Sequence, residues 1–168
     1  MNDINHIYHK NITLEQALLG GIFKIQLENG KTVKVKLKPG SFNGQIIRLK
    51  DLGQVSNGIH SDAYIELKVL NHPIYKVDGL DLRATFMITP TEALMGCSKI
   101  IPGPNGKHLM VDILPDSVDG QEIIFPNSGL ADNQNSGDLI YTVKIDYLDE
   151  LTKAIMKNQN NDPGSYLN

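Results

Sequence analysis

The residue types that most often carry out chemistry are few in this sequence and form no recognisable group. Its five histidines lack a carboxylate or cysteine at a spacing that predicts a catalytic triad or a metal site; they are His6, His9, His60, His72 and His108. The single cysteine, Cys97, can neither close an internal disulfide nor complete a four-ligand zinc site. The glycine pairs lack the strand-to-helix spacing of a phosphate loop. We therefore expect no enzyme activity, no metal and no cofactor.

The charge balance is that of an ordinary globular chain. Lys and Arg number 16 against 19 Asp and Glu, which gives a net charge of −3 and a pI of about 5.9. This balance argues against a dedicated polyanion binder, for which a clustered basic excess is expected. No apolar run approaches the roughly 18 residues of a membrane span, and the N-terminus lacks a signal-peptide pattern. With the lone cysteine, these features predict a cytoplasmic protein that does not contact membranes.

An internal duplication sets the elements that must position any site. Residues 13–69 repeat without a gap at residues 89–145, an offset of 76 positions that is clearest where Pro39–Gln45 aligns with Pro115–Gln121. A period this long exceeds the roughly 20–50 residues of solenoid units, so each copy is expected to be a small domain. We predict a first domain over residues 1–70, a linker over 71–78, a second domain over 79–147 and a C-terminal segment over 148–168.

Within each copy the hydrophobic pattern has a period of two, which is typical of β-strands. In the first copy, Phe23–Leu27 and Val33–Leu37 alternate apolar and polar residues on either side of Asn29–Gly30, a pair that predicts a hairpin turn of type I′. Thr13–Gly20 and Thr91–Gly96 combine a hydroxyl cap, helix formers and a terminal glycine, so each predicts a single helical turn. The expected fold class is all-β, with two tandem, duplicated β-sandwich domains.

The even-numbered strand positions differ between the two copies. Polar or aromatic residues of the first copy are replaced by apolar ones in the second: Lys24, Lys34, Lys38, Arg48 and Tyr64 correspond to Ile100, Met110, Leu114, Ile124 and Ile140. Lysines on a strand face are typical of a solvated surface that discourages edge-to-edge aggregation. In the second copy we expect a neighbouring segment or a partner to cover this face, with a functional apolar surface as the alternative.

One acidic position is the same in both copies. Asp62 and Asp138 each follow a small residue and precede the last strand of their copy. A turn or strand-entry role is the expected one, in preference to a paired acid site.

Six motifs occur in order along the chain: Leu37–Gly40, Gly44–Lys50, Asp62–Ile65, His72–Leu82, Glu92–Gly96 and Gly137–Tyr141. Together they resemble the C-terminal substrate-binding region of DnaJ-type (J-domain) co-chaperones, over about residues 8–147. The resemblance implies two tandem β-sandwich-like domains and a peptide-binding groove on the first. It also implies delivery of unfolded polypeptide clients to the seventy-kilodalton heat-shock chaperone.

Departures from the family pattern indicate which class of the family the sequence resembles. The sequence has no J-domain with His-Pro-Asp, no Gly/Phe-rich segment and no paired Cys-x-x-Cys repeats. It therefore resembles the class without a zinc finger, similar to the curved-DNA-binding co-chaperones, as a fragment or a stand-alone relative. Such a chain is expected to hold clients without stimulating the partner's ATPase. The family's dimerisation helix corresponds to Leu148–Lys157, which runs into the helix-breaking composition of Asn158–Gly164, so a homodimer through this segment stays open.

The resemblance places a peptide-binding groove on the first domain. An extended client offers backbone donors and acceptors, which a sheet edge beside an apolar depression can satisfy. The residues expected there are Ile12, Leu14, Phe23, Lys24, Ile25 and Ile65, with Lys24 at the rim. The alternative interpretation is that the apolar members of this set fill the core of the first sandwich.

Nonspecific DNA binding is the second class of function considered, as in the curved-DNA-binding relatives. Its basis is a run of basic residues that could contact phosphates from a sheet face; they are Lys31, Lys34, Lys36, Lys38, Arg48 and Lys50. The acidic net charge and the few aromatic residues weigh against it. A structural role as a dimeric spacer is a third interpretation.

Overall fold

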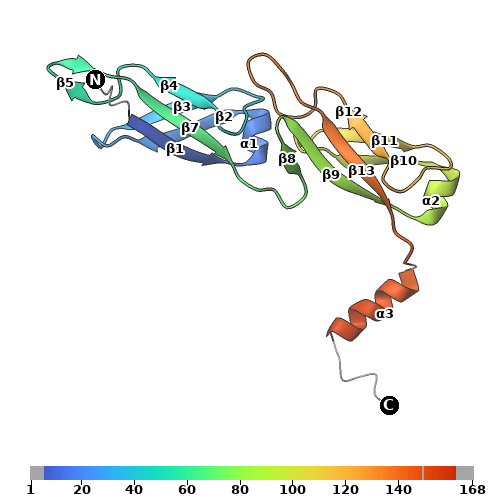
Figure 1. The fold of residues 1–168 in the computed structure, drawn as a ribbon. Helices are drawn as coiled ribbons and strands as arrows, with labels where there is room; N and C mark the ends of the chain where they lie inside the picture. The colour runs from blue at the N-terminus through green and yellow to red at the C-terminus, as the bar shows by residue number, and fades with distance from the viewer. Residues whose placement is uncertain (1–5, 149, 162–168) are drawn as a thin grey trace.

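The structure is a computed structural model that describes residues 6–148 and 150–161 (Figure 1). The described chain consists mainly of strands, with three helices, which confirms the expected all-β class. The first half contains β1 (His6–Ile12), α1 (Leu14–Leu19), β2 (Gly21–Gln26), β3 (Thr32–Leu37), β4 (Ile46–Leu49), β5 (Val55–Ser56), β6 (Ile59–His60) and β7 (Ala63–Val69). The second contains β8 (Lys76–Asp78), β9 (Asp81–Ile88), α2 (Pro90–Met95), β10 (Cys97–Pro102), β11 (His108–Ile113), β12 (Glu122–Phe125), β13 (Leu139–Ile145) and α3 (Glu150–Asn161).

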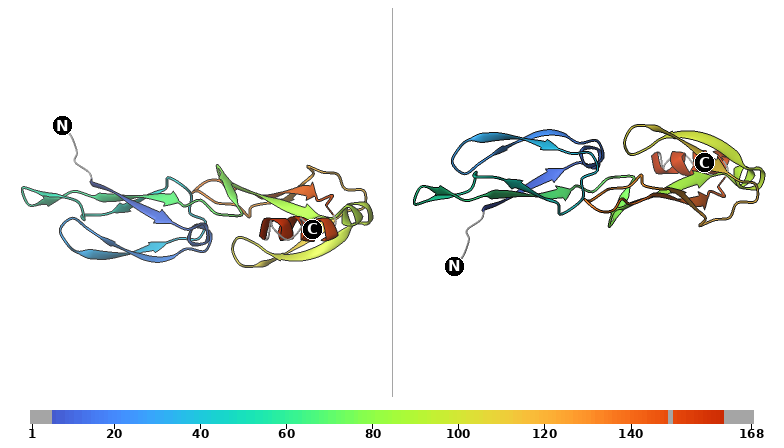
Figure 2. Two further views of the ribbon diagram at one scale, coloured as in Figure 1. Left: turned by 90° about the horizontal axis from the view of Figure 1, so that it is seen from below. Right: turned by 90° about the horizontal axis from the view of Figure 1, so that it is seen from above.

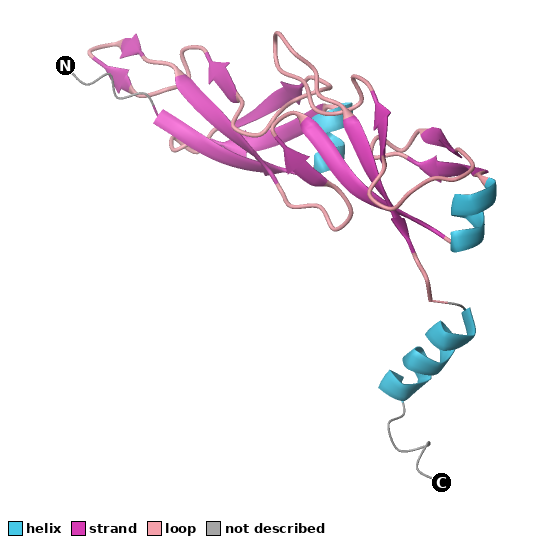
Figure 3. Ribbon diagram, turned by 45° about the vertical axis from the view of Figure 1, so that its right-hand side comes forward, coloured by secondary structure: helices cyan, strands magenta, loops and turns pink. Residues whose placement is uncertain are grey.

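Each half is a two-layer sandwich (Figure 2). In the first half, a sheet in the order β1-β7-β4 lies against the β2–β3 hairpin; in the second, a sheet in the order β12-β13-β9-β8 lies against the β10–β11 hairpin. The pairs β1–β7 and β9–β13 are parallel, and the other pairs are antiparallel. The two sandwiches follow one another along the long axis of the molecule (Figure 3).

The duplication in the sequence is a duplication of structure. The bounds of α1, β2, β3, β4 and β7 reappear 76 residues later in α2, β10, β11, β12 and β13. The β5–β6 pairing of Val55 with His60 also has a counterpart, the isolated bridge between Ala131 and Ser136. Strand β8 is an addition that lies inside the predicted linker and pairs with β9.

The hairpin tips are equivalent, as predicted, but their turn type is not I′. That turn needs positive φ at both central residues, whereas only Gly30 has it, with φ of 88°. The N–H of Leu27 donates to the carbonyl of Lys31 (2.8 Å), so the tip is longer than a two-residue turn. Asn29 instead accepts the Lys31 N–H with its side-chain oxygen (2.9 Å). The Asn105–Gly106 tip repeats this arrangement.

Two short helices join the layers, and each begins with a capping box. Thr13 and Gln16 exchange side-chain to backbone hydrogen bonds at the start of α1. Thr89 and Glu92 do the same at the start of α2. The predicted cap at Thr91 is therefore wrong, because Pro90 occupies the first helical position and the hydroxyl that precedes it is the cap.

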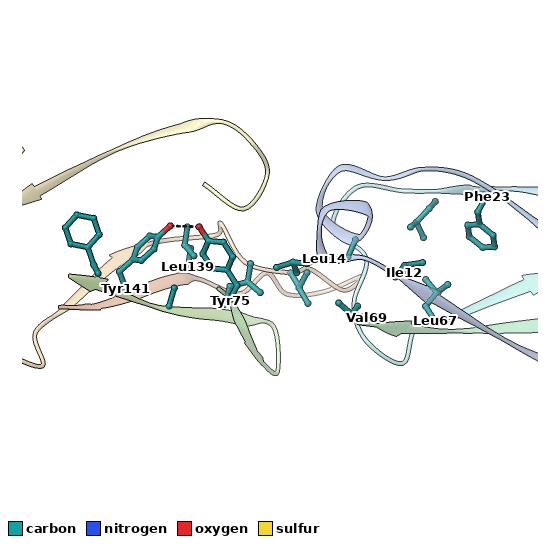
Figure 4. Packing of buried hydrophobic residues seen from close by; sticks show 14 of the residues in the cluster. Ile12, Leu14, Phe23, Leu67, Val69, Tyr75, Leu139 and Tyr141 are labelled. Atoms are coloured by element: carbon teal, nitrogen blue, oxygen red, sulfur yellow. Dashed lines mark hydrogen bonds between the residues drawn. The ribbon is translucent and has the colours of Figure 1, made fainter. Parts of the chain in front are cut away.

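The core of each half consists mainly of the inward side chains of its two layers, to which α1 adds Leu14 and the loop before β13 adds Leu130. The largest fully buried ones are Ile12, Leu14, Ile65, Leu67, Leu82, Ile88, Val111, Leu130, Leu139 and Val143. Tyr75, just before β8, inserts into the second half, where its hydroxyl lies 2.8 Å from that of Tyr141 (Figure 4). The ring of Tyr141 also contacts Phe86 and Phe125 edge-on. This cluster anchors the connecting segment to the second sandwich.

Helix α3 extends from the second half, away from the sandwich (Figure 1). It continues to Asn161, further than the sequence predicted. Asparagine and glutamine cost only some tenths of a kcal/mol in a helix, about 0.7 at most, so Asn158–Asn161 can remain helical until the Pro163–Gly164 breaker, which lies outside the described residues.

Candidate functional site

Strand β2 has an open edge. Its only strand partner among the described residues is β3. Because Leu27 bonds to Lys31 and antiparallel bonding alternates, the odd-numbered residues of β2 bond to β3. The N–H and C=O groups of Ile22, Lys24 and Gln26 therefore point away from β3, and these groups form a row at the edge.

A small depression lies at the start of this edge. Its volume is about 50 Å³, and its lining residues are Ile12, Gln16, Gly20, Gly21, Ile22, Phe23 and Leu37. Gly20 in this lining is required by the backbone, because a Cβ there would lie 2.5 Å from the carbonyl oxygen of Leu37 and its φ is 75°. An edge of backbone groups is thus combined with a shallow hollow, four of whose seven lining residues have aliphatic or aromatic side chains.

The predicted groove residues occupy different places. Ile12 and Phe23 line the depression, although little of either surface is exposed (Figure 4). Leu14 and Ile65 are fully buried in the core, and Ile25 packs against it. Lys24 is exposed on the outer face of the hairpin. The binding role of this set stays a prediction.

Sequence reasoning missed an exposed apolar member of the depression. The side chain of Ile22 is 71% exposed, and its signal is an isoleucine at an even position of β2, where the other even positions carry lysine and glutamine. Gln16 and Gly21 were also missed, because α1 was interpreted only as a structural turn.

A lysine covers the ring of Phe23. The Nζ of Lys10, on β1, lies 5.4 Å from the centroid of that ring. This is a cation–π contact across the gap between the two layers. The aromatic wall of the depression therefore has a positive charge next to it.

The predicted basic run divides between two surfaces. Lys24 and Lys34 are directly paired on the outer face of the hairpin, which also carries the exposed Lys36 and Lys38 nearby. Arg48 belongs instead to β4 in the opposite sheet, where its guanidinium lies 2.6 Å from the carboxylate of Asp62. Arg48 therefore does not extend the lysine face.

The expected turn role of the repeated aspartates is confirmed. Asp62 accepts the N–H of Asp51 (2.9 Å), and Asp138 accepts the N–H of Asn127 (3.0 Å). Both donors have positive φ, near 60°, so each carboxylate holds a strained turn. The Asp51 N–H, and after it the Arg48 guanidinium, hold the pKa of Asp62 below its usual value.

The apolar even-numbered positions of the second half do not form one covered face. They lie on two sheets, with Ile100 and Met110 paired on the hairpin and Ile124 paired with Ile140 on the larger sheet. Ile140 is buried, whereas Ile100, Met110, Leu114 and Ile124 are exposed. The expectation that a neighbouring segment covers them is wrong for these four residues, because no described part of this chain shields them.

Among residues 6–148 and 150–161, no three or more His, Cys, Asp or Glu side chains are grouped so that they could hold a metal ion. The helices within these ranges are too short or too polar to cross a membrane.

The fold and the edge together define a tandem β-sandwich module in which the open edge of β2 lies beside a shallow hollow. The sequence matches the DnaJ C terminal domain over residues 6–147, and the chain belongs to this family. It is 36% identical over 118 residues to a curved DNA-binding protein of Pseudomonas putida (strain GB-1), covering 68% of this chain and 37% of that protein. It is 32% identical over 140 residues to a curved DNA-binding protein of Escherichia coli (strain SMS-3-5 / SECEC), covering 82% and 45%. The chain thus spans less than half the length of these relatives.

Proposed function

We propose that this chain is a co-chaperone substrate-binding module that holds extended segments of unfolded polypeptide along β2. The observation that carries the proposal is the row of outward backbone groups at Ile22, Lys24 and Gln26 beside the depression. A client segment in extended conformation would add a strand there, and one apolar side chain would enter the hollow. Main-chain bonding accepts many sequences, which suits a protein whose clients share only their unfolded state.

Membership of the DnaJ C terminal domain family supports a broader setting for this activity. Held clients would pass to the seventy-kilodalton heat-shock chaperone in the cytoplasm, without catalysis, cofactor or metal on this chain. Helix α3, whose Ile155 and Met156 are about half exposed, would bring two copies together as a homodimer. Two client edges in one dimer would raise the effective concentration of binding sites for a long unfolded chain.

The edge can be tested with a pair of proline substitutions. Lys24→Pro removes an N–H from the open edge of β2 and leaves the β2–β3 ladder intact, because edge prolines are tolerated where the N–H faces solvent. Its matched control is Lys34→Pro, the directly opposed residue on β3, whose N–H points to the other edge. We expect Lys24→Pro to weaken binding of an extended apolar peptide roughly threefold to tenfold, the worth of one hydrogen bond, and Lys34→Pro to leave it unchanged. Equal effects of the two substitutions would contradict edge binding.

The hollow is tested separately. Ile22→Ser should lower the capture of an unfolded model client, measured as suppression of its aggregation. Ile46→Ser, in β4 on the opposite sheet and 59% exposed, is the control for losing an exposed isoleucine. Since both side chains are solvent-exposed, neither change should unfold the domain.

DNA binding is a second candidate, supported by the lysine face of the hairpin and by the similarity to curved DNA-binding proteins. Phosphate contacts by Lys24 and Lys34 would make affinity fall steeply with salt. A gel shift at two salt concentrations distinguishes this function from client capture. The proline pair discriminates as well, because each member removes one lysine, and DNA binding should weaken equally in both.

A further inference from the structure

The lysine and the phenylalanine of the cation–π contact have opposite positions in the two halves. Lys10 on β1 covers Phe23 on β2, and the positions 76 residues later hold Phe86 on β9 and Lys99 on β10. There the Nζ of Lys99 lies 5.9 Å from the centroid of the Phe86 ring. The cation–π contact is kept, but the ring and the amine have changed strands. A lysine therefore occupies the place on β10 that corresponds to the aromatic wall of the first-half depression.

An ion pair fixes that lysine. The Nζ of Lys99 lies 2.7 Å from a carboxylate oxygen of Glu92, whose first-half counterpart, Gln16, lines the depression. The bond from Lys99, followed by the Thr89 N–H, holds the pKa of Glu92 below its usual value. An apolar side chain entering from a client would have to desolvate this pair, which is unfavourable unless the charges are otherwise compensated.

Two further positions that line the first-half depression carry different side chains in the second half, one of them larger and the other polar. Gly21 corresponds to Cys97, and the exposed Ile22 corresponds to Ser98. The hydroxyl of Ser98 is taken by a 2.6 Å hydrogen bond to Asp112. The second-half counterpart of the depression thus offers little apolar surface to a client.

The backbone edge differs too. The N–H of Gly103 donates to the carbonyl of Lys107 (2.8 Å), as Leu27 does to Lys31, so alternation directs the even-numbered groups of β10 to its open edge. Pro102 is one of these residues, and it has no N–H to give. Its counterpart on β2 is Gln26. Proline on an edge strand is a recognised means of preventing further strand addition.

We propose that Glu92, Lys99 and Pro102 are specificity-determining residues that exclude apolar polypeptide segments from β10. This proposal rests on the proposed function, since it concerns the same class of ligand. Its consequence is that each chain binds a client at the edge of β2 and not at the edge of β10. The difference in affinity should be roughly tenfold to hundredfold, as expected when one large apolar side chain loses its burial site.

A transplant tests this directly. The triple variant Glu92→Gln, Lys99→Phe, Pro102→Gln gives α2 and β10 the residue types of α1 and β2 at the three equivalent positions, and it retains Phe86 and the aromatic core. The reciprocal variant Gln16→Glu, Phe23→Lys, Gln26→Pro gives α1 and β2 the residue types of α2 and β10 at these positions. The probe is a labelled extended peptide with alternating leucine and serine. Stoichiometry is read by titration, and the occupied edge by amide hydrogen exchange of β2 and β10.

In the parent we expect one peptide per chain, with protection of β2 amides alone. The transplant should bind a second peptide and protect β10, and the reciprocal variant should lose the first. Should the triple variant fold poorly, Pro102→Gln alone, at an exposed position, must still increase protection of β10. A folded transplant with an unprotected β10 and a normal β2 would overturn the exclusion and leave the proposed function intact, as would equal protection of both edges in the parent. No binding by the parent would overturn the proposed function and the exclusion with it.

Discussion

The backbone N–H of Ala131 donates to the carbonyl oxygen of Gly40 over 3.0 Å, and this bond joins a loop of the second half to a turn of the first. A Cβ on Gly40 would lie 3.2 Å from the Cβ of Ala131, which is closer than two carbon atoms normally approach. The contact between the halves therefore depends on the absence of a side chain at residue 40. In the second half the equivalent residue is Asp116, so the duplication does not extend to this contact.

Gly40→Val should accordingly destabilise the protein more than its control. Gly44 has nearly the same φ, 87° against 84°, but no atom lies within 4 Å of the place that its Cβ would occupy. Gly44→Val thus reports backbone strain alone, whereas Gly40→Val adds overpacking worth about 1–3 kcal/mol. Urea unfolding measures both, and small-angle scattering should show a changed relation of the halves only for Gly40→Val. Equal losses of stability would mean that the contact with Ala131 contributes nothing.

The buried hydroxyl pair offers a double-mutant cycle. Tyr75→Phe should leave the Tyr141 hydroxyl without a partner and cost about 1–3 kcal/mol, the penalty for an unsatisfied buried polar group. Tyr141→Phe should cost a similar amount. The double variant should be close to the parent or only slightly less stable, because neither ring then buries an unpaired hydroxyl. Thermal unfolding provides the measurement; additive costs would show that the two hydroxyls do not interact in solution.

The sequence predicted the fold more completely than it predicted the candidate binding site. Strand positions, hairpin tips and the duplication followed from hydrophobic period and turn residues, because these are local in sequence. The groove set mixed core and surface residues, since period alone assigns Ile65 and Phe23 to the same inward face. Which of them lies nearer the surface depends on how the two layers pack in three dimensions, where Ile65 is 0% and Phe23 9% exposed. The cation–π contact between Lys10 and Phe23, and its reversal in the second half, could likewise not be predicted. A contact between two strands has no signature in either strand alone.

Alkaline pH should destabilise the protein through Tyr141. Burial, and after it the hydrogen bond with Tyr75, raises the pKa of the Tyr141 hydroxyl above its ordinary value of 10.0. The folded state then retains a proton that the unfolded state releases, so this contribution is complete below pH 10 and is lost progressively above it. Urea unfolding between pH 8 and 11 should show the decline, and Tyr141→Phe should reduce it. An identical decline in the variant would assign the alkaline loss to other groups.

Acidic pH should destabilise the protein through Asp62, whose pKa is lowered by folding where that of Tyr141 is raised. Its folded-state pKa lies below the ordinary 3.8, so its contribution to stability is present above that value and is lost as pH falls through the folded value. The largest cause is the N–H of Asp51, and the exposed Arg48 comes second. Asp62→Asn, which keeps an acceptor oxygen for that N–H, should preserve most of the stability near pH 7 and flatten its dependence between pH 4 and 2. Arg48→Met should leave most of that dependence in place, because exposed ion pairs contribute little. Should Arg48→Met flatten the acid limb as fully as Asp62→Asn, the ion pair with Arg48 would stabilise the Asp62 carboxylate more than the hydrogen bond from Asp51 does.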